Sequence, residues 1–130
     1  MKFSVNQKDL QNSLNYCQGV IEKRSTLPIL SNVLLEAKNE NLKITATDLD
    51  LIFIQNIKNI EIEEEGQTTT SCSIMYDIVR KFNNEKKINF NLVNENKINL
   101  ESDNSSFNLN CLKASEFPIT EENFKDNEFT

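Results

Sequence analysis

The stretch KRSTLPILSNVLLEAKNENLKITATDLD, residues 23–50, decides the fold. It contains a basic pair, a proline before an apolar segment, an Asn-rich turn and a second apolar segment. Apolar and polar residues alternate in the second segment, as they do in a half-buried strand. We therefore predict strands over residues 29–36 and 42–47, joined by a turn at 38–41.

Part of this stretch recurs later in the chain. Residues 40–45 (ENLKIT) are echoed at residues 95–100 (ENKINL), which indicates that one small unit occurs twice. The other predicted strands span residues 1–5, 51–54, 57–62, 68–72, 87–93, 97–102 and 107–112, with a break at Gly66.

Two helices are predicted, one in each copy of the unit. Asn6 is placed as the N-cap of the first helix, and Gly19 as its end. Its apolar face is formed by Leu10, Leu14 and Cys17. Ser73 is placed as the N-cap of the second helix. The apolar face of that helix is marked by Ile74, Ile78 and Phe82.

The order strand, helix and about three strands therefore occurs twice. This order predicts an α+β domain in which two helices lie side by side on one face of a continuous antiparallel sheet. At 130 residues the chain has the length of one domain. Its apolar runs are strand-sized and its start lacks a signal peptide, so we expect a cytoplasmic protein with no membrane span.

The composition argues against most kinds of catalytic mechanism. The chain has no histidine, which removes the commonest general base and zinc ligand. Cys17, Cys72 and Cys111 are widely spaced without a CxxC pair, so we interpret them as reduced, buried residues. The net charge of −6 argues against binding nucleic acid through charge alone, because such binding needs clustered Lys and Arg.

A few residues could carry chemistry. Asp48 and Asp50 form a DxD pair of the kind that can hold a divalent cation. A metal-dependent hydrolase that uses Asp48, Asp50 and Glu61 is therefore one alternative, and a protein-interaction domain without a DNA role is another. The DxD pair lacks a Gly turn and a later bidentate Glu, so we favour a polar strand end and expect no metal and no cofactor. Arg24 in its loop and Arg80 on the second helix could each bind a phosphate.

A known family matches these residues in order along nearly the whole chain. The matching segments are MKFSV (1–5), RSTLPILSN (24–32), TATDL (45–49), DIVR (77–80), FNL (107–109) and ASEFP (114–118). They resemble the bacterial DNA polymerase III beta subunit, the replicative sliding clamp. The resemblance implies a DNA-clamp domain, the first of three in a subunit, each built from a duplicated unit.

The resemblance also implies a role and partners. Two subunits would close head to tail into a ring that encircles double-stranded DNA, slides along it and tethers the polymerase, without catalysis. Weak phosphate contacts favour sliding, so a negative net charge is tolerated if the inner helices are not negative. By position, Arg24 matches a DNA-contacting arginine of the family, and Arg80 matches a basic residue on the inner helix; we expect both to contact DNA. Ser73 stands where the family often has an arginine, which puts that contact in doubt.

The same resemblance places the subunit interface and the domain boundary. The interface is expected at the edge strand around Phe107, with Ile74 near it, against the third domain of a partner subunit. Residues 1–127 would form the first domain and residues 128–130 the start of the second. The pocket that binds polymerase and clamp-loader peptides belongs to the other domains.

Overall fold

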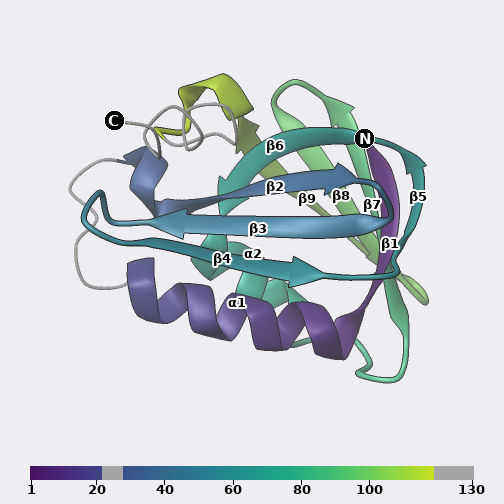
Figure 1. Cartoon of the computed structure of the whole chain (residues 1–130). Helices are drawn as coiled ribbons and strands as arrows, with labels where there is room; N and C mark the ends of the chain where they lie inside the picture. The colour runs from purple at the N-terminus through teal and green to yellow at the C-terminus, as the bar shows by residue number, and fades with distance from the viewer. Residues whose placement is uncertain (22–27, 119–130) are drawn as a thin grey trace.

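The structure, a computed structural model, describes residues 1–21 and 28–118 (Figure 1). The helical elements in this part are α1 (Gln7–Ile21), η1 (Pro28–Ser31), α2 (Cys72–Val79) and η2 (Ala114–Glu116), where η marks a short 3-10 helix. The strands are β1 (Lys2–Asn6), β2 (Asn32–Lys38), β3 (Asn41–Thr47), β4 (Ile52–Ile57), β5 (Glu61–Glu64), β6 (Gly66–Ser71), β7 (Lys87–Asn94), β8 (Lys97–Ser102) and β9 (Ser105–Leu112).

The strands form a nine-stranded sheet in the order β4-β3-β2-β6-β9-β8-β7-β1-β5, and every pair in it is antiparallel. The chain order β1-α1-β2-β3-β4 is repeated as β6-α2-β7-β8-β9, with β5 as an additional strand. The first strand of each half pairs with the other half, β1 with β7 and β6 with β2. The predicted duplication is therefore confirmed, and the sequence echo falls at the turns into β3 and β8.

Both helices pack against each other and against one face of the sheet (Figure 1). Leu10, Leu14 and Cys17 of α1 and Met75 and Val79 of α2 are buried in the core between helices and strands. The helices are also joined by Gln7, whose Nε2 donates to the carbonyl oxygen of Val79 at 2.8 Å. The prediction of two adjacent helices on one face is confirmed.

The two halves of the sheet meet between β6 and β9, where backbone pairing is short. Only Thr69 with Leu112 and Thr70 with Cys111 are paired there. Side chains extend the join, because the Thr69 hydroxyl donates to the Leu112 carbonyl at 3.0 Å and the Thr70 hydroxyl to the Asn110 carbonyl at 2.9 Å. The first part of β9, up to Asn110, is left as a sheet edge on this side among the described residues.

Both predicted helix ends need correction. The N-cap of α2 is Ser71, whose hydroxyl accepts from the Ile74 backbone N–H at 3.3 Å, and not Ser73, which lies inside the helix. The first helix continues past Gly19 to Ile21. Ile21 is buried in the core, and this contact extends the helix beyond the glycine.

Three strand boundaries were also wrong. The segment predicted as a strand from residue 29 begins as the 3-10 turn η1, since a proline favours the first position of a helical turn. The strands predicted at 51–54 and 57–62 are instead β4 and β5, separated by a turn in which Asn59 has φ 61°. The break predicted at Gly66 falls one residue earlier, at Glu65, because Gly66 itself begins β6. No helix in the described residues is long and apolar enough to cross a membrane.

Candidate nucleic-acid interface and subunit edge

The exposed surface of the two helices carries balanced charge. The charged residues of α1, α2 and the α2 C-cap are Lys8, Asp9, Asp77 and Arg80. These are two cations and two anions, whereas the whole chain has a net charge of −6. The rest of the exposed surface of the helices is mostly uncharged, and includes Asn12, Asn15 and Ser73. Within the described ranges 1–21 and 28–118, the acidic excess therefore falls on residues outside the two helices.

Arg80 is held by neighbours on α2. Its Nη2 lies 2.7 Å from Asp77 Oδ1, and its Cζ lies 4.9 Å from the centre of the Tyr76 ring. The Tyr76 hydroxyl donates in turn to Asn15 Oδ1 of α1 at 3.2 Å. Half of the Arg80 side chain remains exposed, so the guanidinium can still be reached by a phosphate from solvent.

The other two DNA-contact predictions fare differently. Ser73 is exposed in the first turn of α2, on the same helix as Arg80. Arg24 lies outside the described residues, so the structure leaves its prediction untested.

The two residues predicted for a subunit interface lie on different elements, Ile74 on α2 and Phe107 in the part of β9 that β6 leaves unpaired. Ile74 on α2 is 54% exposed, which is high for an isoleucine. Phe107 on β9 is half-buried and its ring meets that of Phe82 edge to face, with the ring centres 5.6 Å apart. An exposed apolar side chain and an unpaired strand edge are each typical of surfaces that bind another chain.

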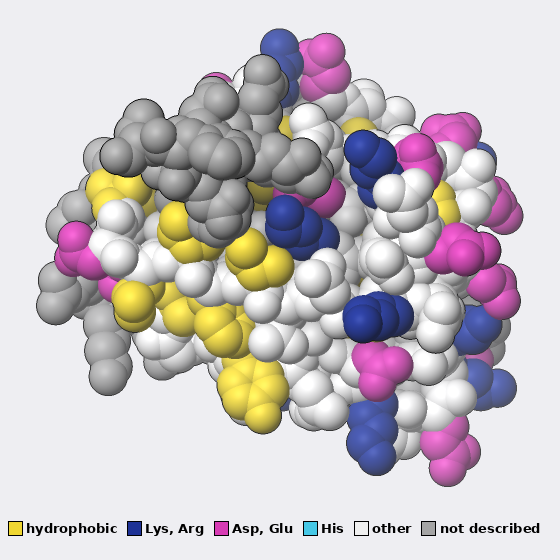
Figure 2. All heavy atoms as spheres, in the orientation of Figure 1, with side chains coloured by type: hydrophobic (Ala, Val, Ile, Leu, Met, Phe, Trp, Pro, Cys, Tyr) yellow, Lys and Arg dark blue, Asp and Glu magenta, His cyan; other side chains and the backbone are white. Residues whose placement is uncertain are grey.

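A second apolar surface surrounds the other sheet edge. It comprises exposed Tyr16, Leu49, Leu51 and Ile52 together with half-buried Phe53, and we call it the β4 patch. The rings of Tyr16 and Phe53 are tilted against each other, with their centres 6.3 Å apart. Figure 2 shows hydrophobic side chains gathered over this part of the molecule, whereas acidic and basic side chains are mixed over the side where β1, β5 and β7 lie.

The DxD pair forms a turn. Asp48 Oδ1 accepts from the backbone N–H groups of Asp50 and Leu51, at 2.9 and 2.8 Å. Glu61, on β5, is paired with Lys87 at 2.9 Å. Across the described residues, no group of three or more Cys, Asp or Glu side chains could hold a metal ion, so Asp48, Asp50 and Glu61 are not brought together.

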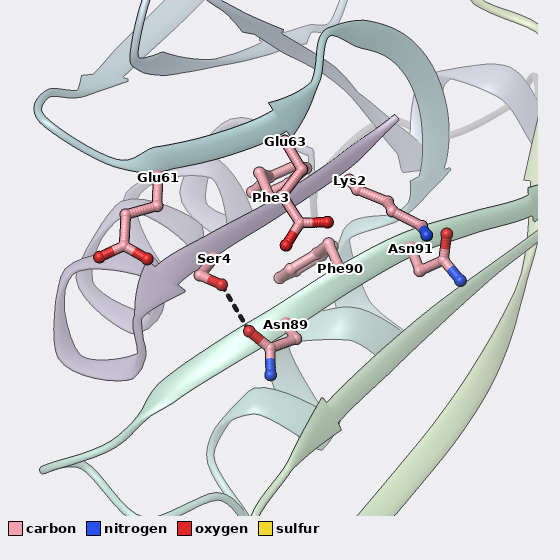
Figure 3. A pocket seen from close by; sticks show the side chains of 8 residues that line it. All are labelled: Lys2, Phe3, Ser4, Glu61, Glu63, Asn89, Phe90 and Asn91. Atoms are coloured by element: carbon pink, nitrogen blue, oxygen red, sulfur yellow. Dashed lines mark hydrogen bonds between the residues drawn. The ribbon is translucent and has the colours of Figure 1, made fainter.

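A small hollow of about 200 Å³ opens between β1, β5 and β7 (Figure 3). Phe3 and Phe90, whose stacked rings have centres 4.7 Å apart, are among the residues that line it. Lys2, Glu63 and Asn91 project around it. Strand residues alternate between faces, so Lys2 and Asn91 lie on the face of the sheet opposite the helices. The hollow is thus separate from the helical surface.

All three cysteines are free and buried, as the sequence predicted. Burial raises the pKa of the Cys17 thiol to about 12. Burial also raises the pKa of Cys111, while hydrogen bonds with Thr68 and Thr70 oppose that shift. Neither thiol is suited to act as a nucleophile at neutral pH.

Comparison with known proteins assigns the family. The sequence model of the DNA polymerase III beta subunit, N-terminal domain, matches residues 1–121. The chain belongs to this family. It is 34% identical over 122 residues to the beta sliding clamp of Pseudomonas putida, with 94% of this chain and 33% of that protein covered. It is 32% identical over 130 residues to the Escherichia coli K12 clamp, with 100% of this chain and 35% of that protein covered.

Solved beta-subunit structures agree with the fold. The structure of Caulobacter crescentus pol III beta matches with a TM-score of 0.85 at 34% identity, over 93% of this chain and 32% of that one. The beta subunit of Pseudomonas aeruginosa matches with a TM-score of 0.85 at 31% identity, over 93% of this chain and 32% of that one. The chain therefore spans about a third of the length of its beta-subunit relatives.

The sequence pointed to Arg80 as a DNA-contact candidate, but it did not reveal the residues that orient its side chain, Asp77, Tyr76 and Asn15. The spacing of Asp77 and Arg80, three residues apart on a helix, is a signal for an ion pair. The contact between Tyr76 and Asn15 has no local signal, because these two residues are 61 positions apart in the sequence and lie on different helices.

Proposed function

We propose that this chain is the first domain of a processivity clamp for the bacterial replicative DNA polymerase. In this proposal the full-length protein forms a ring around duplex DNA, slides along it and tethers the polymerase without catalysing a reaction. The ring would act in the cytoplasm, where the chromosome is replicated. The polymerase and the clamp loader would bind domains outside this chain.

The observation that carries the proposal is the charge balance of the helical surface. A ring that encircles DNA holds it by topology, so its inner surface needs no strong attraction to phosphates. A surface with equal numbers of cations and anions, many amides and half-exposed Arg80 fits weak contacts that do not depend on base sequence. We place Arg24, Arg80 and Ser73 at this contact, with Ser73 as the weakest member.

A closed ring gives each domain two neighbours, and this domain offers two surfaces for them. We assign Ile74 and Phe107, at the free part of β9, to the partner subunit of a homodimer. We assign the β4 patch to the next domain of the same chain, which would begin near residue 128 after a first domain of residues 1–127. Both surfaces combine exposed apolar side chains with an unpaired strand edge.

The DNA-facing surface can be mapped by NMR titration of the 130-residue chain with a 24-base-pair duplex at low salt. We expect small shift changes at exposed positions of α1 and α2, the same for two unrelated duplex sequences, and loss of the changes as salt is raised. Changes confined to the outer face of the sheet, or a preference for one duplex sequence, would contradict the proposal.

A further inference from the structure

The Arg80 guanidinium is held from two directions. Asp77 contacts Nη2 at 2.7 Å, and the Tyr76 ring lies under the guanidinium carbon at 4.9 Å. Tyr76 is half-buried, and its hydroxyl is fixed by Asn15 of the other helix at 3.2 Å. The orientation of Arg80 is therefore set by α2 and, through Tyr76, by α1.

This arrangement lowers the strength with which Arg80 can bind a phosphate. A guanidinium binds phosphate best when two parallel N–H groups face it and its charge is not neutralised. Asp77 occupies one nitrogen of the fork and places a negative charge beside the incoming phosphate. A phosphate must then displace Asp77 or accept a weaker contact with the remaining N–H groups.

We propose that Asp77 and Tyr76 are positioning residues that restrain Arg80 and weaken its contact with DNA phosphate. The inference rests on the proposed function, since it assumes that DNA passes over the helices. A weak contact between Arg80 and phosphate would favour sliding, because each phosphate contact must be released before the ring can move by one step. A free arginine at this position would bind each phosphate longer.

The test compares Asp77→Asn, Arg80→Ala and the double variant in the 130-residue chain. The readout is the apparent affinity for a 24-base-pair duplex by NMR titration, and its dependence on salt. Exposed ion pairs of this kind contribute a few tenths of a kcal/mol, so we expect Asp77→Asn to tighten binding about twofold and to steepen the salt dependence.

Two controls separate this mechanism from a general change in charge. Glu101→Gln removes one negative charge from an exposed strand position on the sheet face opposite the helices, and should leave the affinity unchanged. The gain from Asp77→Asn should vanish in the Arg80→Ala background, as a double-mutant cycle requires. A gain that persists without Arg80, or an equal gain from Glu101→Gln, would overturn the inference.

Tyr76 is tested by the mobility of the guanidinium. Tyr76→Phe keeps the ring under Arg80, whereas Tyr76→Leu removes it. We expect the heteronuclear NOE of the Arg80 Nε–H group to be preserved in Tyr76→Phe and lowered in Tyr76→Leu. Equal values in both variants would overturn the role of the ring.

The outcomes distinguish this inference from the proposed function. If Arg80→Ala weakens DNA binding but Asp77→Asn has no effect, Asp77 does not weaken the contact of Arg80 with phosphate. The proposal that the two helices face DNA is then still supported. If Arg80→Ala leaves the affinity and its salt dependence unchanged, α2 does not face DNA and both proposals fail.

Discussion

Gly66, the first residue of β6, stands at a position where Met1 leaves no room for a side chain. A Cβ at this position would lie 2.9 Å from Met1 Cβ, closer than carbon atoms approach in proteins. Its backbone does not require glycine, since no described glycine has a positive φ. The close approach of Met1 is therefore the reason for the residue.

Gly66→Ala should lower the free energy of unfolding by about 1–3 kcal/mol, the usual cost of overpacking. Gly19→Ala is the matched control, because nothing lies within 4 Å of the added Cβ and the position is helical. It should raise the free energy of unfolding by about 0.5–1 kcal/mol. Urea denaturation of both variants measures the difference, and a stabilised Gly66→Ala would contradict the assignment.

The buried thiols provide a second prediction at this scale. Burial raises the pKa of Cys17 from 9.0 to about 12. Between these two pH values the folded chain therefore keeps the thiol proton, whereas the unfolded chain loses it. The free energy of unfolding should therefore fall as the pH rises from 9 toward 12. At pH 8 we expect Cys17, Cys72 and Cys111 to resist iodoacetamide in buffer and to react in urea. Rapid labelling of the folded chain would show that the thiols are accessible.

At the scale of elements, the join between β6 and β9 depends on threonine hydroxyls. Thr69 and Thr70 are fully buried and donate to carbonyl groups of β9, where the backbone ladder has only two residue pairs. Thr69 also accepts from Asn32 Nδ2 of β2 at 3.1 Å. These side chains connect the two halves of the sheet.

Replacing Thr69 and Thr70 with valine keeps the shape and removes the hydroxyl donors. We expect the double variant to lose about 2–3 kcal/mol of unfolding free energy, roughly 1 per hydrogen bond, with faster amide exchange in β9. Thr45→Val is the control, because Thr45 is buried but its hydroxyl has no hydrogen bond with a described residue. If Thr45→Val is destabilised as much per residue, the threonine hydroxyls at the join between β6 and β9 do not stabilise it specifically.

The elements also show what local sequence patterns can predict. Alternation and helical spacing predicted the repeated order of elements, because both depend on residues close in the chain. They misplaced β4, where polar Gln55 and Asn56 lie inside an edge strand that tolerates them. The choice of Ser71 over Ser73 as N-cap, and the pairing of β1 with β7, depend on tertiary contacts that no short segment encodes.

At the scale of the whole molecule, Ile74 should matter for the ring and not for the domain. Ile74→Asp changes an exposed side chain, so the free energy of unfolding of the chain should stay within about 0.5 kcal/mol. In the full-length protein an aspartate in the proposed subunit interface should weaken the dimer by tenfold or more, about 1.4 kcal/mol or above. Sedimentation velocity over a dilution series measures this change.

Val93→Asp is the matched control for Ile74→Asp. Val93 is 57% exposed and Ile74 54%, but Val93 lies near the β7–β8 turn and away from the proposed interface. The dimer should be unaffected by it. Equal weakening by both variants would move the interface elsewhere.

The central claim is that DNA is held by topology and that charge contributes little. Under the proposed function, a full-length protein that carries this domain and is placed on nicked circular duplex DNA by a clamp loader should stay on the circle in high salt. It should leave when a restriction enzyme cuts the circle. Retention on linear DNA equal to that on circular DNA, or release from the intact circle by salt alone, would contradict the account.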